Sequence, residues 1–325
     1  MRLRAGNTLI CATVAAFWMV TFAARGEPNP PVSQASARTE IILLGTLHGL
    51  HNTNANYSLE VLRRIIVALK PSAILVELPP MIGGRPTVQN GRISEQFSGN
   101  ENTAANLAAE ALHVSVIPYD REGRNEFYEK TRYFNRVKEA SERLDRWVED
   151  QAQKDPESVE VLTSRVLYDS ANGSQAYLMR NAGPETINSA ALDMVIVNKK
   201  CIQHRVWPKM LAASGRQELA GEFLFIREEW EERNKIMAGN IAEIGRRHSG
   251  RRLVVLCGAE HRYFLRDLLA KAAGVTLKEF YEVPEWTGSG KGTRSLDGTG
   301  EEAEVTRQGR KGEPSAPTDA ENPRR

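Results

Sequence analysis

Short apolar runs alternate with segments of helical spacing along two parts of the chain, and they predict the strands of a parallel sheet. Between these runs apolar residues recur at helical spacing, as they do over 59–69. Continuous apolar runs separated by helices are typical of strands that are buried on both faces of a sheet. The pattern predicts an α/β fold with a mostly parallel sheet core and strands over 40–44, 73–78, 114–118, 252–257 and 277–283.

Between about Glu126 and His248 no strand is predicted, and Glu, Arg, Lys, Ala and Leu dominate in long helical patterns. Breaks in these patterns fall at Asn172–Gly173, Gly183–Pro184 and Ser214–Gly215. The stretch 126–248 is therefore predicted to be a large helical insertion, or cap, that divides the core into halves over 39–125 and 249–284. Its expected helices lie near 126–154, 156–170, 186–214 and 217–247.

The two ends of the chain do not have the pattern of a folded domain. Arg2 and Arg4 precede an apolar stretch over 9–24, which is typical of a secretory signal peptide and short for a membrane span. We predict a signal peptide over 1–26, or an N-terminal anchor if it is not cleaved, followed by a linker over 27–38. The tail 285–325 contains almost no apolar residues and is predicted to be disordered. The expected location is periplasmic or secreted, with membrane attachment only through an uncleaved N-terminal segment.

Composition and charge narrow the classes of partner. The formal net charge is only +2 and both signs are interspersed, so the basic surface of a nucleic-acid-binding protein is not expected. Peptides or small molecules remain as the expected substrates, and the oligomeric state is left open. Cleavage of the signal peptide would remove Cys11. The two cysteines that remain, Cys201 and Cys257, are too few for a disulfide framework.

Two of the predicted strands end in the pattern Gly-x-x-His. Gly45 to His48 follows the run 40–44, and Gly258 to His261 follows the run 252–257. Because parallel sheets place their ligands beyond the carboxyl ends of the strands, both histidines are candidates for one site. Glu77 is the third candidate, since a carboxylate within the run 73–78 is costly to bury without a partner.

Two imidazoles and one carboxylate form a common ligand set for zinc, manganese, cobalt or iron(II), with open positions for water and substrate. We therefore expect His48, Glu77 and His261 to hold a divalent transition metal and to act in catalysis, since a metal lowers the pKa of bound water. The plainer alternative is that the histidines are hydrogen-bonded structural residues and that Glu77 pairs with Arg121 or Arg233.

Further residues near the strand ends are possible members of the site. His51 lies in the loop after His48 and is either a ligand or acid–base group, or a solvated histidine. Asp120 and Arg121 end the third strand and are either an ion pair that orders the loop or groups that position a substrate.

With these residues placed, the chain resembles the superfamily that groups the TraB, PrgY, GumN and TIKI proteins with ChaN and the erythromycin esterases. The resemblance covers about 40–283, and five motifs in a common order carry it: Gly45 to His48, Val76-Glu77-Leu78, Asp120-Arg121, Arg233-Asn234 with Met237, and Gly258 to His261. It implies a divided α/β core with a helical cap and a site at His48, Glu77 and His261. TIKI relatives are described as metal-dependent proteases, esterase relatives use a histidine base, and ChaN relatives bind haem.

The leading hypothesis is an exported metal-dependent hydrolase of peptide or ester bonds, in which Arg233 or Arg121 stabilises the developing oxyanion. Asn234 belongs to the same helical motif as Arg233. The alternative is a haem- or iron-binding protein with an axial ligand from Tyr57, Tyr119, Tyr177 or a histidine. A third hypothesis is a regulatory or scavenging module without turnover.

Overall fold

A five-stranded parallel sheet forms the core of the chain, as the sequence predicts. The computed structural model describes residues 37–154 and 159–287. The strands lie in the order β7-β2-β8-β1-β9, and every neighbouring pair is parallel. Their bounds are β1 Thr39–Thr46, β2 Ala73–Val76, β7 Ser115–Pro118, β8 Arg252–Gly258 and β9 Val275–Lys278. Two short hairpins precede β7, formed by β3 Met81–Ile82 with β4 Arg85–Pro86 and by β5 Val88–Gln89 with β6 Arg92–Ile93.

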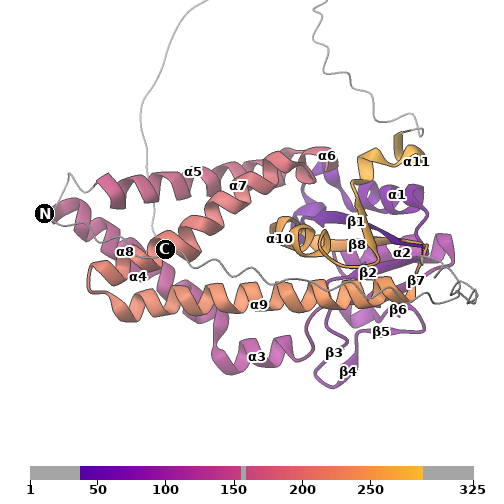
Figure 1. Ribbon diagram of the computed structural model, residues 1–325, viewed down its shortest axis with the longest axis horizontal. Helices are drawn as coiled ribbons and strands as arrows, with labels where there is room; N and C mark the ends of the chain where they lie inside the picture. Colours follow the sequence, from indigo (N-terminus) through magenta and orange to yellow (C-terminus); the bar gives the residue numbers. More distant parts are fainter. Residues whose placement is uncertain (1–36, 155–158, 288–325) are drawn as a thin grey trace, which may run out of the picture. The chain divides into compact units, whose positions relative to one another are not determined.

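Helices cover both faces of this sheet because its strands are apolar on both sides. In β1, Ile42 and Leu44 belong to one apolar core and Ile41 and Leu43 to another, as the alternation of side chains along a strand requires. The first core is covered by α1 (Leu59–Leu69) and α2 (Glu101–Leu112). The second is covered by the C-terminal half of α9 (Gln217–Arg247) and by α10 (Ala259–Leu269). Figure 1 shows α9 running beside the sheet and on into the cap.

Helices alone make up the cap among the described residues between 124 and 247. A third apolar core, around Leu144, Trp207, Leu211 and Phe223, lies within it. The first half of α9 closes this core, so one helix joins the cap to the sheet. The other helices of the cap are α3 Arg124–Thr131, α4 Tyr133–Lys154, α5 Val159–Asn181, α6 Pro184–Ile187, α7 Ala190–Cys201, the π-helix η4 Ile202–Val206 and α8 Trp207–Ala213.

The bounds of the cap helices differ from the predicted ones at three places. The predicted helix 126–154 is divided at Arg132, whose φ of 53° ends α3. The predicted break at Asn172–Gly173 is wrong, because α5 continues through it to Asn181 and packs against α7. A single glycine inside a helix costs only about 1 kcal/mol, which the packing of a long helix outweighs. The predicted helix 186–214 is four shorter segments, α6, α7, η4 and α8.

The C-terminal part of the core also differs from the prediction. The last strand ends at Lys278, and Phe280–Glu282 form a 3₁₀ turn (η5) instead of continuing the strand to Val283. The helix α11 spans Pro284–Thr287, so the predicted disordered tail does not begin at 285. The predicted signal peptide, all but the last two residues of the linker, and the rest of the tail lie outside the described residues. No helix in the described part of the chain has the length and apolarity needed to cross a membrane.

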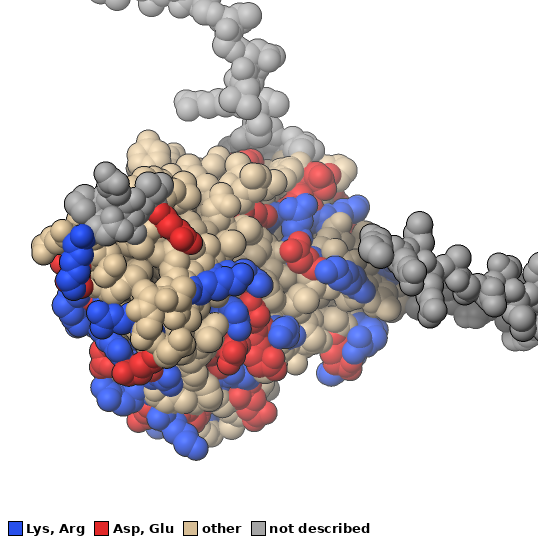
Figure 2. Space-filling view, turned by 60° about the vertical axis from the view of Figure 1, so that its left-hand side comes forward, with Lys and Arg blue, Asp and Glu red and all other residues tan. Residues whose placement is uncertain are grey.

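The described surface carries charges of both signs. Figure 2 shows Lys and Arg interspersed with Asp and Glu over the face that it draws. Many of these charges form exposed pairs one helical turn apart, such as Glu60 with Arg63 and Lys154 with Asp150. Such pairs contribute little to stability, so the charged residues that matter for function are the buried ones.

Candidate functional site

The residues after three neighbouring strands lie close together at a cavity between the sheet and the cap, and two of them, Glu77 and His261, line it. Glu77 directly follows β2, Asp120 follows β7, and His261 lies in the first turn of α10 after β8. The cavity has a volume of about 850 Å³. It is lined by His48, Glu77, Arg124, Asn125, Tyr128, Glu129, Arg132, Tyr133, Phe134, Asn135, Lys200, Trp230, Arg233, Glu260 and His261. The structure therefore brings His48, Glu77, His261 and Arg233 to the same place.

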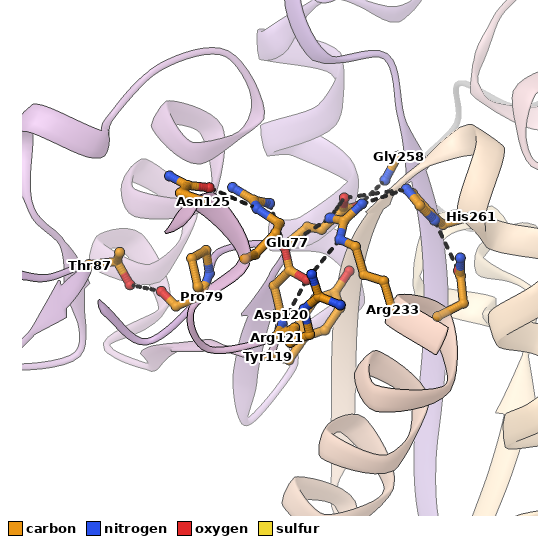
Figure 3. Close-up of polar contacts among 12 residues, drawn as sticks. Glu77, Pro79, Thr87, Tyr119, Asp120, Arg121, Asn125, Arg233, Gly258 and His261 are labelled. Atoms are coloured by element: carbon orange, nitrogen blue, oxygen red, sulfur yellow. Dashed lines mark hydrogen bonds and ion pairs between the residues drawn. The ribbon is translucent and has the colours of Figure 1, made fainter. Parts of the chain in front are cut away.

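Arg233, on the cap helix α9, connects these strand ends (Figure 3). Its Nε and Nη2 donate to the two carboxylate oxygens of Asp120, at 3.0 and 2.8 Å. Nη2 also donates to Glu77 Oε1 at 2.6 Å, and Nη1 donates to His261 Nε2 at 3.1 Å. The planar guanidinium can satisfy three partners at once because its donors lie in a fixed fork. One buried cation therefore connects the residues that follow three neighbouring strands.

The hydrogen bonds of His261 identify its tautomer. The amide Nδ2 of Asn234 donates to the Trp230 carbonyl at 2.7 Å, which turns its Oδ1 toward His261. His261 Nδ1 lies 2.9 Å from that oxygen and must donate to it, so Nε2 is the unprotonated nitrogen that accepts from Arg233. Burial lowers the pKa of His261 to about 4, and the charge of Arg233 adds to this effect. His261 is therefore neutral at physiological pH.

Glu77 is ionised, and both of its oxygens have partners. Oε1 accepts from Arg233, and Oε2 accepts from the backbone N–H of Gly258 at 2.7 Å. Burial alone would raise the pKa of Glu77, but the surrounding groups, with Arg233 as the permanent cation, lower it to about 2. The expectation that Glu77 pairs with an arginine is met by Arg233 and not by Arg121.

This arrangement does not fit a divalent metal held by the predicted trio. Among the described residues, no three His, Cys, Asp or Glu side chains are grouped so that they could hold an ion. The two atoms that a metal would need, Glu77 Oε1 and His261 Nε2, are 3.6 Å apart and both receive hydrogen bonds from Arg233. The charges of Arg233 and Arg124 already balance those of Glu77 and Asp120. A dication would have to displace the guanidinium.

His48 differs from the other members because its side chain is half-exposed, at 53%, and no described residue binds its Nε2. Its Nδ1 lies 2.6 Å from Oε1 of Glu101, the first residue of α2. This hydrogen bond raises the pKa of His48 to about 9, against the opposing effect of burial. The backbone of His48 has a φ of 49°, which costs a residue with a Cβ about 1–2 kcal/mol. The fold thus holds the imidazole at the edge of the cavity on a strained backbone, and its Nε2 lies beside Gly258.

The glycines of the two Gly-x-x-His motifs allow close approaches, and that of Gly258 lies at this site. A Cβ at Gly258 would lie 2.6 Å from His48 Nε2 and 3.6 Å from Glu77 Oε2, so only glycine leaves room for both groups. A Cβ at Gly45 would lie 3.2 Å from Asn188 Oδ1, which accepts the Gly45 N–H. The glycine of the second motif is therefore required by the packing of His48 and Glu77.

Two of the possible additional residues have structural roles. His51 is buried, contrary to the solvated alternative, and both ring nitrogens have partners: Nε2 accepts from Leu47 N–H and Nδ1 donates to the Tyr57 carbonyl. It therefore has no nitrogen free for a ligand and holds the loop after β1 in place. Arg121 pairs with Glu229 at 2.7 Å, away from the cavity, whereas Asp120 pairs with Arg124 and Arg233. The ion pair expected between Asp120 and Arg121 is therefore not among the pairs of the described residues.

The tyrosines considered for haem ligation differ in accessibility. Tyr57 and Tyr119 are buried, and their hydroxyls donate to the carbonyls of Gly45 and Leu256. Tyr177 is 67% exposed on α5 and does not line the cavity. None of the three faces the site around Arg233.

The sequence pattern does not indicate Glu101, Lys200 or Trp230, which partner His48 or line the cavity. Glu101 is the first residue of α2, and the other two lie on the cap helices α7 and α9. No local pattern distinguishes these residues from solvated or core residues.

Comparison of the chain with protein families, with curated proteins and with solved structures found no match.

Substitution of Gly258 by alanine should disturb the site without a backbone penalty, because its φ of −51° is open to any residue. We expect a loss of about 1–3 kcal/mol in the free energy of unfolding and a displaced His48 ring signal in NMR spectra, since the new methyl group overlaps His48 Nε2. The matched control is Gly173→Ala in α5. A Cβ added there would meet no neighbouring atom within 4 Å, and a small increase in stability is expected. An unchanged His48 signal in Gly258→Ala would contradict this packing.

The ring of His48 should titrate near pH 9 instead of near 6.5. Glu101→Gln keeps the shape of the partner but removes its charge, so it should bring the midpoint back toward 6.5. Glu110→Gln, an exposed position on the same helix, should leave the midpoint unchanged. NMR titration of the histidine rings measures all three, and a wild-type midpoint near 6.5 would refute the ion pair.

The same pKa shift predicts the pH dependence of stability. Because the pKa of His48 is raised from 6.5 to about 9, its pair with Glu101 stabilises the fold fully below pH 6.5. This contribution is lost as the pH rises through about 9. The difference in unfolding free energy between wild type and Glu101→Gln should shrink over that range.

Proposed function

We propose that the chain is a hydrolase of ester or peptide bonds in which His48 transfers the proton. The observation that carries the proposal is the His48–Glu101 pair, in which the carboxylate holds Nδ1 of a histidine that lines the cavity and leaves Nε2 without a partner among the described residues. A base that is oriented by a third group is the arrangement used to activate a nucleophile in many unrelated enzymes. Export from the cytosol remains a prediction from the N-terminal sequence.

In the proposed reaction, neutral His48 takes a proton from water through Nε2 while the water oxygen attacks the carbonyl carbon. The contacts to Asp120, Glu77 and His261 use four of the five N–H groups of Arg233, which leaves the second hydrogen of Nη1 for the developing oxyanion. His48 then returns the proton to the leaving oxygen or nitrogen as the bond breaks.

The mechanism contains no metal step, because Arg233 already engages Glu77 and His261 at the atoms that a metal would need. Their role in the proposal is to fix the guanidinium, which Asp120 holds from the other side. The preformed geometry supports stabilisation of charge without rearrangement during the reaction. A hydrolase dependent on zinc, manganese, cobalt or iron would require Arg233 to withdraw.

The test is cleavage of a panel of nitrophenyl esters and fluorogenic peptides by the purified chain. His48→Ala should lower kcat/KM about 10²- to 10⁴-fold, because it removes the base while leaving the core intact. His248→Ala, at the end of α9 and outside the cavity, is the matched control. In the wild type, kcat/KM should rise with pH, reach half of its limiting value near pH 9 and level off only above that pH, since His48 acts in its neutral form.

Two results would overturn the proposal. One is cleavage that persists in His48→Ala at the wild-type rate, and the other is a wild type that cleaves nothing in the panel. A Soret band in the absorbance spectrum of the purified protein would instead support the haem-binding alternative.

A further inference from the structure

One wall of the cavity carries a surplus of positive charge. Lys199 and Lys200, on α7, share the single carboxylate of Glu260, with Nζ–O distances of 2.9 and 3.2 Å. Glu260 also accepts from the neutral amide of Gln175 at 2.6 Å. Within the described ranges, no other carboxylate lies within ion-pair distance of either ammonium group. Two largely buried cations, Lys199 and Lys200, therefore share one anion.

Neighbouring groups are consistent with this surplus. Burial lowers the pKa of His204 to about 3, and the charges of Lys200, Arg227 and Arg205 add to the effect. Burial also lowers the pKa of Lys200. A cation in a partly desolvated wall gains stability when an anion reaches it. Of the two lysines, Lys200 lines the cavity and Lys199 does not, so only Lys200 is placed to meet a ligand there.

Aromatic rings line the cavity beside Lys200 and His261. The Trp230 ring is stacked on the His261 ring, with centroids 5.8 Å apart and an angle of 11°. Lys200 Nζ lies 5.3 Å from the centroid of Trp230. Tyr128 and Tyr133 are stacked with each other, 4.7 Å apart, on the α3–α4 wall. Such faces favour a ligand with a flat or ring-shaped body.

We propose that Lys200 is the binding residue for a carboxylate on the substrate, and that the flat body of the substrate lies along Trp230 with its scissile bond at His48. The class of substrate is therefore an aromatic or other ring-containing ester or amide that also carries a free carboxylate. The position of the scissile bond rests on the proposed hydrolase function, whereas the binding of the carboxylate does not.

Isothermal titration of the full chain tests binding without turnover. The probes are 1-naphthylacetate and 1-naphthylacetamide, which share the ring and differ in the charge of the side group. The wild type should bind the carboxylate about 10- to 100-fold more tightly than the amide, as expected for a charge-assisted hydrogen bond. Lys200→Met should abolish this preference, and Lys209→Met, an exposed lysine on α8, should keep it.

The affinities of the wild type for the two probes test the carboxylate site even if Lys200→Met fails to fold. Equal affinity for the two probes, or binding of neither, would overturn the inference, as would a preference that survives in folded Lys200→Met. Carboxylate binding in a chain that cleaves no ester would support the Lys200 site and refute the hydrolase. Faster cleavage of neutral than of carboxylate-bearing nitrophenyl esters would refute the Lys200 site and leave the hydrolase standing.

Discussion

The buried guanidinium of Arg233 is the contact on which the rest of the site depends. It reaches from the cap helix α9 to Asp120, Glu77 and His261, which follow β7, β2 and β8, three neighbouring strands of the sheet. Losing this cation would leave the two buried carboxylates of Glu77 and Asp120 with only Arg124 to balance their charge, which is far more costly than losing an exposed ion pair. Arg233 therefore ties the cap to the core and gives the site its geometry at the same time.

This constraint divides the titratable groups into two kinds. Glu77 and His261 are occupied by Arg233, and their pKa values are lowered so that one stays ionised and the other neutral. His48 belongs to a separate pair with Glu101, and its pKa is raised instead. Groups whose environments shift their pKa values in opposite directions are typical of sites where one residue transfers a proton and the others hold charge in place. That division favours His48 as the reacting residue.

Much of this was accessible from sequence because buried parallel strands are continuous apolar runs, and because polar residues at their carboxyl ends share one edge of the sheet. The rule placed His48, Glu77 and His261 together before any contact was known. It could not show that Arg233 lies between two of them, since α9 meets the sheet through packing far along the chain. Glu101 was missed for a similar reason, and the break expected at Gly173 was wrong because helix packing outweighs a local propensity.

The most direct measurement is a pair of crystal structures of the chain, one grown without added metal and one soaked in manganese or zinc chloride, with anomalous data from the soaked crystal. We expect the guanidinium of Arg233 to lie between Glu77 and His261 in both crystals, with no anomalous peak among these three residues. A peak bound by His48, Glu77 and His261, with Arg233 turned away, would contradict it.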